Sequence, residues 1–319
     1  MKWLVPAPQK LASFLQDQFA GKYSGKQLRR ALEANLCRVN GSVERFASRL
    51  LKRGDAVELA PSWKSLLNPN LTGFKTLYED EYLMIVDKPA GWVCADPNAL
   101  KAFGPKRYLV HRLDKDTTGL LLIAKSPQAR DALMELFEKR EIEKSYLALV
   151  DGIPRESRGR SESLFMKKGS FEGQTIWGSG SKGLTAITEW EKIGAGEKCS
   201  LLLCRPFTGR THQIRVHLAE MGHPILVDRQ YAKSFRCRVF IPRTLLHALR
   251  LKFVHPFLKR EIDLLSSLPV DIHDVLVQVS VDMGHLRELL HKKEEKDARN
   301  GRHEDEEAEE AGKSPHLVH

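Results

Sequence analysis

The stretch of sequence that decides the fold reads His111-Arg112-Leu113-Asp114-Lys115-Asp116-Thr117-Thr118-Gly119-Leu120. It lies between two apolar runs with the length and composition of β-strands, Tyr108 to Val110 before it and Leu120 to Ile123 after it. Charged and hydroxyl side chains gathered at a junction between strands indicate a functional site. A simple polar turn has the same local composition, so the neighbouring sequence must decide between the two interpretations.

Strand and helix patterns alternate on both sides of this motif. Leu83 to Val86 and Tyr146 to Val150 are apolar runs of strand length, and Ser126-Pro127 is typical of the start of a helix. Gly, Ser and Arg are frequent between Arg155 and Lys182, which predicts a surface loop there. Further on, a helix is predicted from Thr211 to Met221, where Gly222 ends it.

A smaller unit of two helices and a few short strands precedes this region. Ser24, with Gln27 three residues later, forms a capping-box pattern that starts the second helix. Asn40-Gly41 is a strong signal for a tight turn between two strands. The apolar positions of the second helix recur at helical spacing and predict its buried face, which consists of Leu28, Ala31, Leu32 and Leu36. Lys26, Arg29 and Arg30 remain on the outer face, which is mainly basic.

These patterns divide the chain into four segments. We expect a small domain over residues 1–62, a linker rich in Pro, Ser and Asn over 63–72, and a large domain over 73–290. Residues 291–319 have mixed charges and no hydrophobic period, which favours a disordered tail.

The charge of the chain favours a polyanionic partner. Its 319 residues carry a formal charge of +10. The last 28 residues contain six Lys or Arg and nine Asp or Glu, so residues 1–291 carry about +13. Such an excess favours nucleic acid through neutralisation of phosphates and release of counterions. A basic surface with no nucleic-acid partner is the plainer alternative.

The remaining composition indicates a soluble protein of the reducing cytoplasm. The five cysteines form no CxxC pair, and the N-terminus lacks the basic and then apolar pattern of a signal peptide. Charged residues interrupt every apolar run before it reaches the roughly 20 residues of a membrane span. No membrane association is therefore expected.

The motif around Asp114 closely resembles the catalytic motif of the RluA-type pseudouridine synthases. Three further stretches match motifs of that family in the right order: Lys88-Pro89-Ala90-Gly91, Glu143-Lys144-Ser145-Tyr146-Leu147-Ala148, and Gly209-Arg210-Thr211-His212-Gln213-Ile214-Arg215-Val216-His217-Leu218. The resemblance spans roughly residues 75–265. It implies an α+β catalytic domain with a mixed, largely antiparallel sheet of the pseudouridine synthase type.

The resemblance also implies roles for individual residues. Asp114 corresponds to the catalytic carboxylate, Tyr146 to the active-site tyrosine, and Arg215 to the active-site arginine. The reaction breaks the N1–C1′ bond of uridine and rejoins the base through C5. Asp114 is expected to act either as a nucleophile at C1′ or as a base at C2′, with Arg215 fixing the carboxylate in its charged form. The plainer interpretation of Tyr146 is a strand residue packed in the core, and that of Arg215 is a surface residue of the helix.

RNA binding is expected from a second set of residues. By family analogy, Arg112 fills the gap left when the target uridine is extruded from folded RNA. Lys88 and Arg210 lie in the matched motifs and are also expected to contact RNA. The small domain resembles the S4-type RNA-binding module, a small α/β domain, so Lys26, Arg29 and Arg30 are expected to bind RNA as well. Its opening differs from the family pattern, because Lys10-Leu11-Ala12 replaces the usual Arg-Leu-Asp.

The sequence thus predicts a cofactor-free and metal-free RNA pseudouridine synthase, acting on large-subunit (23S-type) ribosomal RNA as a monomer with no obligate protein partner. Transfer RNA is the alternative substrate. Two other classes remain open: a glycosidase or metal-dependent glycosyltransferase built on Asp114 and Asp116, and an inactive RNA-binding assembly factor. Arg112 and Lys115 beside the two aspartates disfavour the binding of a cation.

Overall fold

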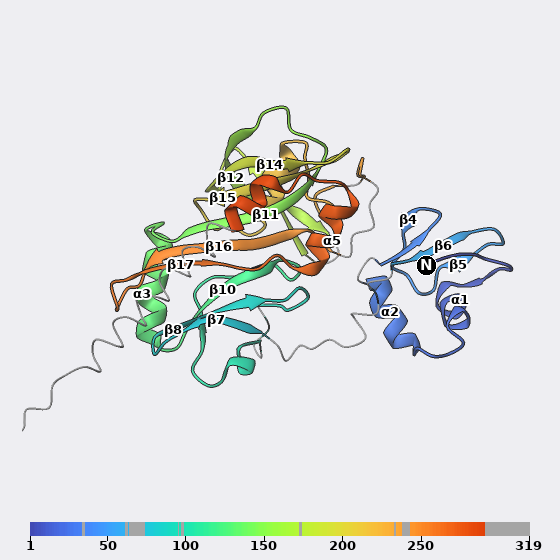
Figure 1. Ribbon diagram of the computed structural model, residues 1–319, viewed down its shortest axis with the longest axis horizontal. Helices are drawn as coiled ribbons and strands as arrows, with labels where there is room; N and C mark the ends of the chain where they lie inside the picture. Colours follow the sequence, from blue (N-terminus) through green and yellow to red (C-terminus); the bar gives the residue numbers. More distant parts are fainter. Residues whose placement is uncertain are drawn as a thin grey trace, which may run out of the picture.

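The computed structural model describes residues 1–33, 36–60, 63, 74–94, 96, 99–171, 174–232, 234–237 and 243–290. The expected linker and tail fall almost entirely outside these residues. Figure 1 shows the N-terminal unit on one side of a larger body that is built around a long, twisted sheet. Within the described residues, no helix is long and apolar enough to cross a lipid bilayer.

The N-terminal unit combines two helices with short strands. Four strands pair in the order β1 (Lys2–Leu4), β6 (Ala56–Leu59), β3 (Cys37–Val39) and β4 (Ser42–Val43), and β2 (Gln9–Lys10) pairs separately with β5 (Leu50–Leu51). The two helices are α1 (Leu11–Gln18) and α2 (Gly25–Glu33).

The local signals of this unit are confirmed. The Ser24 N–H donates to Gln27 Oε1 at 2.8 Å and the Gln27 N–H donates to Ser24 Oγ at 3.3 Å, which is the expected capping box. Asn40 and Gly41 both have positive φ, as the turn between β3 and β4 requires. The predicted apolar face of α2 is buried in a core that also contains Phe14 and Trp63.

The large body is one mixed sheet. Its strands follow the order β13 (Gln174–Gly180), β12 (Arg158–Phe171), β14 (Leu184–Ala195), β15 (Cys199–Pro206), β11 (Glu143–Asp151), β16 (Leu246–Val254), β10 (Thr118–Ala124), β8 (Leu83–Lys88) and β7 (Lys75–Glu79). β17 (Glu261–Leu265) pairs with β16, and β9 (Tyr108–Leu109) pairs with β10. Neighbouring strands run antiparallel except at the centre, where β10 and β16 are parallel. The expected α+β class with a largely antiparallel sheet is confirmed.

Glycine permits the close approach of the two central strands. Gly119 has φ +105°, and a Cβ at this position would lie 2.2 Å from the carbonyl oxygen of Ala248. A larger residue would push β10 away from β16. The motif that contains Asp114 therefore ends at the close approach of the two central strands.

Helices and loops surround the sheet. α3 (Pro127–Glu138) begins at Ser126, whose Oγ accepts from the Ala129 N–H at 3.1 Å, as the sequence predicted. α3 buries Ala129 and Leu133 against β8 and β10. α4 (Gln213–Glu220) packs on β14 and β15. α5 (Val270–Gln278) packs against the part of the core that β11, β15 and β16 form. A short 3-10 helix, η2 (Ala99–Phe103), completes the region near β7.

One prediction was wrong. The segment Arg155 to Lys182 is not a surface loop, because most of it forms the hairpin of β12 and β13. The inward positions at the start of β12 are small residues, so the strand lacks the apolar alternation that sequence reasoning looks for. Gly159 shows why: a Cβ there would lie 2.5 Å from the indole of Trp190.

Candidate active site

The loop that contains Asp114 leads from β9 to β10. It turns tightly, with the Thr117 N–H donating to the Asp114 carbonyl at 3.1 Å. The Lys115 carbonyl accepts from the Gly91 N–H at 2.8 Å and from Lys88 Nζ at 3.1 Å. Lys88 also donates to the Pro89 carbonyl at 2.8 Å. The Lys88-Pro89-Ala90-Gly91 turn therefore fixes the backbone of the Asp114 loop from inside the protein.

This arrangement corrects the expectation for Lys88. Only 1% of the side chain is exposed, and burial lowers the pKa of its ammonium to about 8. Because its donors are directed at carbonyl groups of the protein, Lys88 supports the loop and is not placed to contact RNA.

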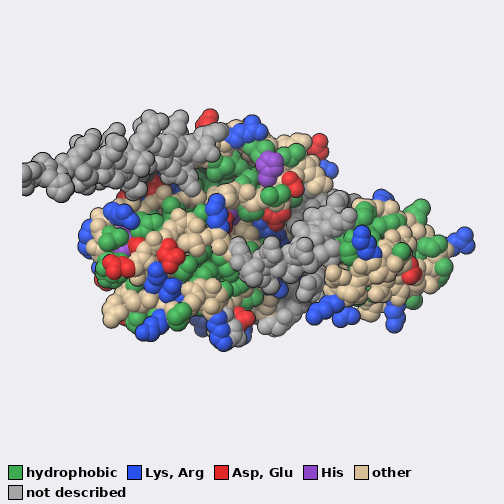
Figure 2. Space-filling view, turned by 60° about the horizontal axis from the view of Figure 1, so that its bottom comes forward, with side chains coloured by type: hydrophobic (Ala, Val, Ile, Leu, Met, Phe, Trp, Pro, Cys, Tyr) green, Lys and Arg blue, Asp and Glu red, His purple; other side chains and the backbone are tan. Residues whose placement is uncertain are grey.

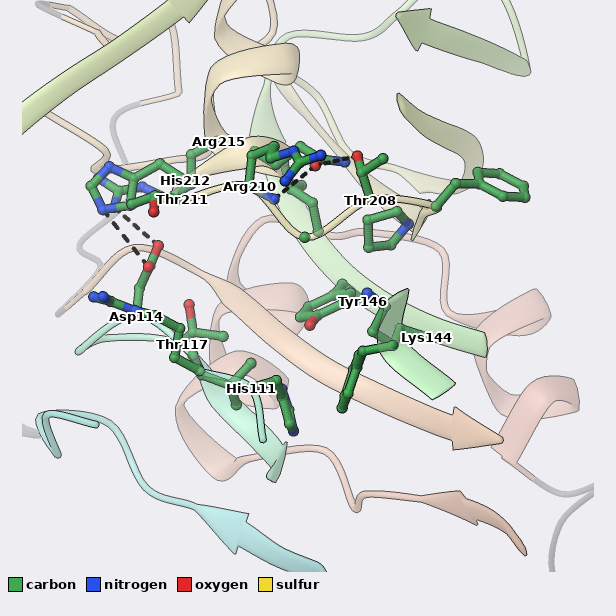
Figure 3. Close-up of a pocket in the computed structure, with 18 of the residues that line it drawn as sticks. His111, Asp114, Thr117, Lys144, Tyr146, Thr208, Arg210, Thr211, His212 and Arg215 are labelled. Carbon is green, nitrogen blue, oxygen red and sulfur yellow. Dashed lines mark hydrogen bonds and ion pairs between the residues drawn. The ribbon is translucent and has the colours of Figure 1, made fainter. Parts of the chain in front are cut away.

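Arg215 projects from the first turn of α4 toward Asp114, as Figure 3 shows. Its Nη1 donates to Asp114 Oδ2 at 3.1 Å. The opposite edge of the guanidinium donates to both oxygens of Asp228, from Nε at 2.6 Å and from Nη2 at 2.8 Å, and Nη2 also donates to Gln230 Oε1 at 2.8 Å. Burial lowers the pKa of Arg215, but the hydrogen bonds and charges of Asp228 and Asp114 outweigh it and raise the pKa above its ordinary value. The cation beside Asp114 is permanent.

His212 and Tyr231 complete the wall on this side of the carboxylate. His212 lies at the N-cap of α4 in the left-handed conformation, with φ 59°. Its Nε2 is 3.7 Å from Asp114 Oδ1, and its Nδ1 is 2.8 Å from the Tyr231 hydroxyl. Burial lowers the pKa of His212 below its ordinary value, so the ring is neutral at neutral pH. The Tyr231 ring lies 5.1 Å from the Arg215 guanidinium and supports it by a cation–π contact.

A cavity of about 490 Å³ opens beside Asp114, and Tyr146 lies on its wall. Tyr146 follows an irregularity in the pairing of β11 with β16, between Ser145 and Tyr146. The pairing skips Leu249, so the extra residue lies on β16 opposite this point of β11. Burial, together with the charge of Asp114, raises the pKa of the Tyr146 phenol, which therefore stays protonated. Lys144 lies two residues earlier on the same strand, and Figure 3 shows Tyr146 between it and Asp114.

Lys144 is a second cation on this wall. Burial lowers the pKa of its ammonium to about 8, and its Nζ lies 5.5 Å from the Phe137 ring. Within the described part of the chain, no carboxylate pairs with it. His111 lines the same part of the cavity, where burial lowers its pKa to about 3 and its Nε2 accepts from the Leu122 N–H. A ligand with negative charge is therefore favoured here.

The loop from Phe207 to Thr211 forms the rim of the cavity and is held from below by Gln213. Gln213 Oε1 accepts from Thr208 Oγ1 at 2.6 Å and from the Arg210 N–H at 3.0 Å, while its Nε2 donates to the Ile187 carbonyl at 2.9 Å. Arg210 lines the cavity and donates through Nε to the Thr185 carbonyl at 3.1 Å. The polar residues of the third matched motif thus fix their own loop.

A buried arginine supports the loop that contains Asp114 from behind. Arg243 is 6% exposed and donates to the Asp116 carbonyl at 2.8 Å and to Thr118 Oγ1 at 3.3 Å. Asp271, in the first turn of α5, accepts from its Nε and Nη2 at 2.7 and 3.0 Å. Thr118 Oγ1 also lies 2.9 Å from His247 Nδ1.

A second cavity of about 670 Å³ adjoins Asp114 on the side of the N-terminal unit. Its lining includes Arg112 and Arg229 from the large body and Arg45 from the small unit. Arg112 is exposed and lines both cavities. The approach to the carboxylate is therefore basic.

The structure brings most of the predicted site residues together and separates others. Asp114, Tyr146, Arg215, Arg112 and Arg210 line one cavity. Lys26 and Arg29 are exposed on α2 of the small unit. The side chain of Arg30 lies outside the described residues. In the part of the chain that the structure describes, no cluster of three or more His, Cys, Asp or Glu side chains is arranged to hold a metal ion.

Sequence reasoning missed Asp228, His212, Lys144 and Arg243 as members of the site. His212 and Lys144 stand inside motifs that the sequence does reveal. Asp228 and Arg243 lie in segments of unremarkable composition, and the only local signal is that Asp228 closes the short apolar run Ile225 to Val227.

Comparisons with known proteins agree with this geometry. The family described as RNA pseudouridylate synthase matches residues 82–220. The chain is 32% identical to the ribosomal large subunit pseudouridine synthase D of Zymomonas mobilis over 223 residues. The aligned region covers 61% of this chain and 69% of that protein. It is 33% identical over 247 residues to the ribosomal large subunit pseudouridine synthase C of Buchnera aphidicola, covering 69% of this chain and 78% of the relative.

Solved structures give the same result. Human RNA pseudouridylate synthase domain containing 4 superposes with a TM-score of 0.55 and 25% identity, over 65% of this chain and 94% of the human one. Human RNA pseudouridylate synthase domain containing 1 gives a TM-score of 0.54 and 28% identity, over 63% and 86% of the two chains.

Proposed function

Because this chain belongs to the RNA pseudouridylate synthase family and isomerises uridine to pseudouridine in RNA, we propose that it acts on large-subunit ribosomal RNA. The support for this substrate comes from the two bacterial relatives, both of which are named as ribosomal large subunit synthases. Transfer RNA is the alternative.

Asp114 is the catalytic carboxylate, and one observation carries this assignment: the 3.1 Å bond from Arg215 Nη1 to Asp114 Oδ2 beside an open cavity. The isomerisation breaks N1–C1′, turns the uracil and forms C5–C1′; C5 then loses a proton and N1 gains one. Whether Asp114 attacks C1′ or removes the C2′ proton, it must be ionised and aimed at the ribose. Arg215 supplies both conditions through a charge-assisted hydrogen bond.

Tyr146 provides a flat surface for the uracil. Its position beside Asp114 on the cavity wall suits a base whose ribose lies at the carboxylate. Because the raised pKa keeps the phenol protonated, Tyr146 acts by stacking and as a hydrogen-bond donor in the resting enzyme.

The basic residues at the approach hold the RNA. Extruding a uridine from folded RNA costs a few kcal/mol, which a side chain that enters the gap offsets. Arg112 is placed for this role because it is exposed next to Asp114 and lines both cavities. Arg210 lies on the same rim and is suited to a phosphate contact.

The N-terminal unit, residues 1–62, is an S4-like RNA-binding domain joined by a linker to a catalytic domain over 73–290. The exposed Lys26 and Arg29 on α2 support this role. Figure 2 shows Lys and Arg side chains on the visible face of both units. The enzyme works as a monomer in the cytoplasm and needs no coenzyme, since the reaction retains every uridine atom except the exchanged C5 hydrogen.

Pseudouridine mapping of total RNA, with and without the gene, tests the substrate. We expect one or a few sites in large-subunit ribosomal RNA to lose the modification when the gene is deleted. Sites lost only from transfer RNA would overturn the substrate assignment and leave the reaction intact. Unchanged maps, together with no tritium release from RNA labelled at uridine C5, would favour an inactive assembly factor.

Deletion of residues 1–62 tests the division of labour between the domains. The truncated enzyme should show a KM for RNA raised by about ten-fold or more, because basic contacts to phosphate are lost. Its single-turnover rate at saturating RNA should stay close to that of the full chain. A collapse of that rate at saturation would contradict this division of labour between the two domains.

A further inference from the structure

Phe207 is an exposed aromatic residue on the rim of the active-site cavity. It directly follows the last residue of β15, and the residue is 43% exposed. A single exposed apolar side chain is ordinary on a protein surface. Phe207 differs because it lines the cavity that also contains Asp114 and Tyr146.

The backbone at Phe207 is fixed before any ligand arrives. The Phe207 N–H donates to the Ile187 carbonyl at 2.9 Å, and the next residue, Thr208, is buried. Thr208 Oγ1 accepts from the Ile187 N–H at 2.9 Å and donates to Gln213 Oε1 at 2.6 Å. A backbone that is already ordered loses little further conformational freedom on binding, which favours affinity.

The charges around the ring favour a flat apolar ligand over a phosphate. The Arg160 guanidinium lies 5.7 Å from the ring centroid, as a cation–π contact. Arg160 is itself paired with Glu162 and Glu189, each at 3.2 Å, so it offers no unbalanced positive charge to an anion. Lys144, which pairs with no carboxylate among the described residues, lies on the cavity wall instead.

We propose that Phe207 is a stacking platform for an unpaired nucleobase next to the target uridine in the RNA. The inference rests on the RNA modification activity and deepens it, because it assigns a second base-binding subsite beside the one at Tyr146. Single-stranded RNA bases stack on exposed aromatic rings, and each such contact strengthens binding without requiring a particular base. This subsite contributes affinity and choice of sequence context, and it takes no part in the bond changes at C1′.

The test combines protein and RNA changes in a double-mutant cycle. The probe is a synthetic stem-loop that carries the uridine found by mapping, whichever class of RNA it comes from. Phe207→Ala should raise KM about ten-fold and leave the single-turnover rate at saturation within two-fold of the parent, whereas Phe207→Trp should keep the parent KM. Phe257→Ala is the matched control, because Phe257 is another partly exposed aromatic that stacks on Tyr82 away from the cavity.

Abasic nucleotides are then placed one at a time on either side of the uridine. At one position, loss of the base should raise KM of the parent enzyme about ten-fold and add nothing further in Phe207→Ala. If removing the base and removing the ring raise KM independently at every position, so that the two fold-changes multiply, the proposal is overturned. An unchanged KM in Phe207→Ala would overturn it as well. If the ribosomal RNA assignment is wrong, the mapping of modified sites will show it first. The test at Phe207 stays valid, because its probe carries whichever uridine the mapping identifies.

Discussion

Both carboxylate oxygens of Asp228 accept hydrogen bonds from Arg215, one from Nε at 2.6 Å and one from Nη2 at 2.8 Å. This pairing occupies the edge of the guanidinium that faces away from Asp114 and leaves Nη1 directed at the Asp114 carboxylate. Asp228 is only 2% exposed, so the pair is shielded from salt and water. The orientation of Arg215 is thus set before RNA binds.

Asp228→Asn should therefore slow catalysis although Asp228 does not touch Asp114. We expect a fall of roughly 100-fold in the single-turnover rate, the scale of effect that a small misplacement of a catalytic group produces. KM should change much less. Gln230→Ala removes a neutral contact to the same Nη2 and is the matched control, with an expected fall of only a few-fold. Equal rates in both variants would show that Arg215 needs no such orientation.

Arg243→Lys should reveal the support behind the catalytic loop. A single ammonium cannot reach Asp271, the Asp116 carbonyl and Thr118 together, so the loop loses part of its anchoring. We expect the single-turnover rate to fall about ten-fold with KM unchanged. The matched control is Arg250→Lys on β16, which breaks a similar paired contact to Asp263 away from the cavity and should not alter the rate. A change in KM alone would argue against a positioning role for Arg243.

Lys144 should make RNA binding depend on pH. Its pKa is lowered to about 8, so the side chain is an ammonium below that pH and a neutral amine above it. If the ammonium binds an RNA phosphate, KM should rise as pH increases from 7.5 to 9. Lys144→Met should have a raised KM throughout and no such slope. Lys139→Met, which removes an exposed lysine of a surface ion pair, should keep the parent slope, and a slope that persists in Lys144→Met would contradict the assignment.

The sequence reveals what short-range patterns encode. The capping box at Ser24, the start of α3 at Ser126 and the buried stripe of α2 follow from spacing alone, and the structure has each of them. The Asp114 and Arg215 motifs are recognisable because each is a long run of specific polar residues. Their mutual contact joins positions 101 residues apart, and it was expected from the family resemblance and from the chemistry of a carboxylate that must stay ionised.

What the sequence does not reveal depends on burial and on long-range packing. Lys88 was expected to meet RNA, but a lysine at the end of a fully covered strand points into the protein, and composition cannot show that direction. Asp228 and Arg243 act through residues that are distant in the chain. β12 escaped prediction because small residues at the inward positions of its first half remove the usual alternation, and the tight contact with Trp190 leaves no room for a side chain at Gly159.

The proposed catalysis depends most directly on the carboxylate at position 114. The measurement that tests it is tritium release from RNA labelled at uridine C5, under single-turnover conditions, by Asp114→Asn beside the parent enzyme. We predict a fall of at least about a thousand-fold in release, with RNA affinity within a few-fold of the parent, because Asn keeps the shape and loses the charge. Release by Asp114→Asn at the parent rate would contradict the central claim.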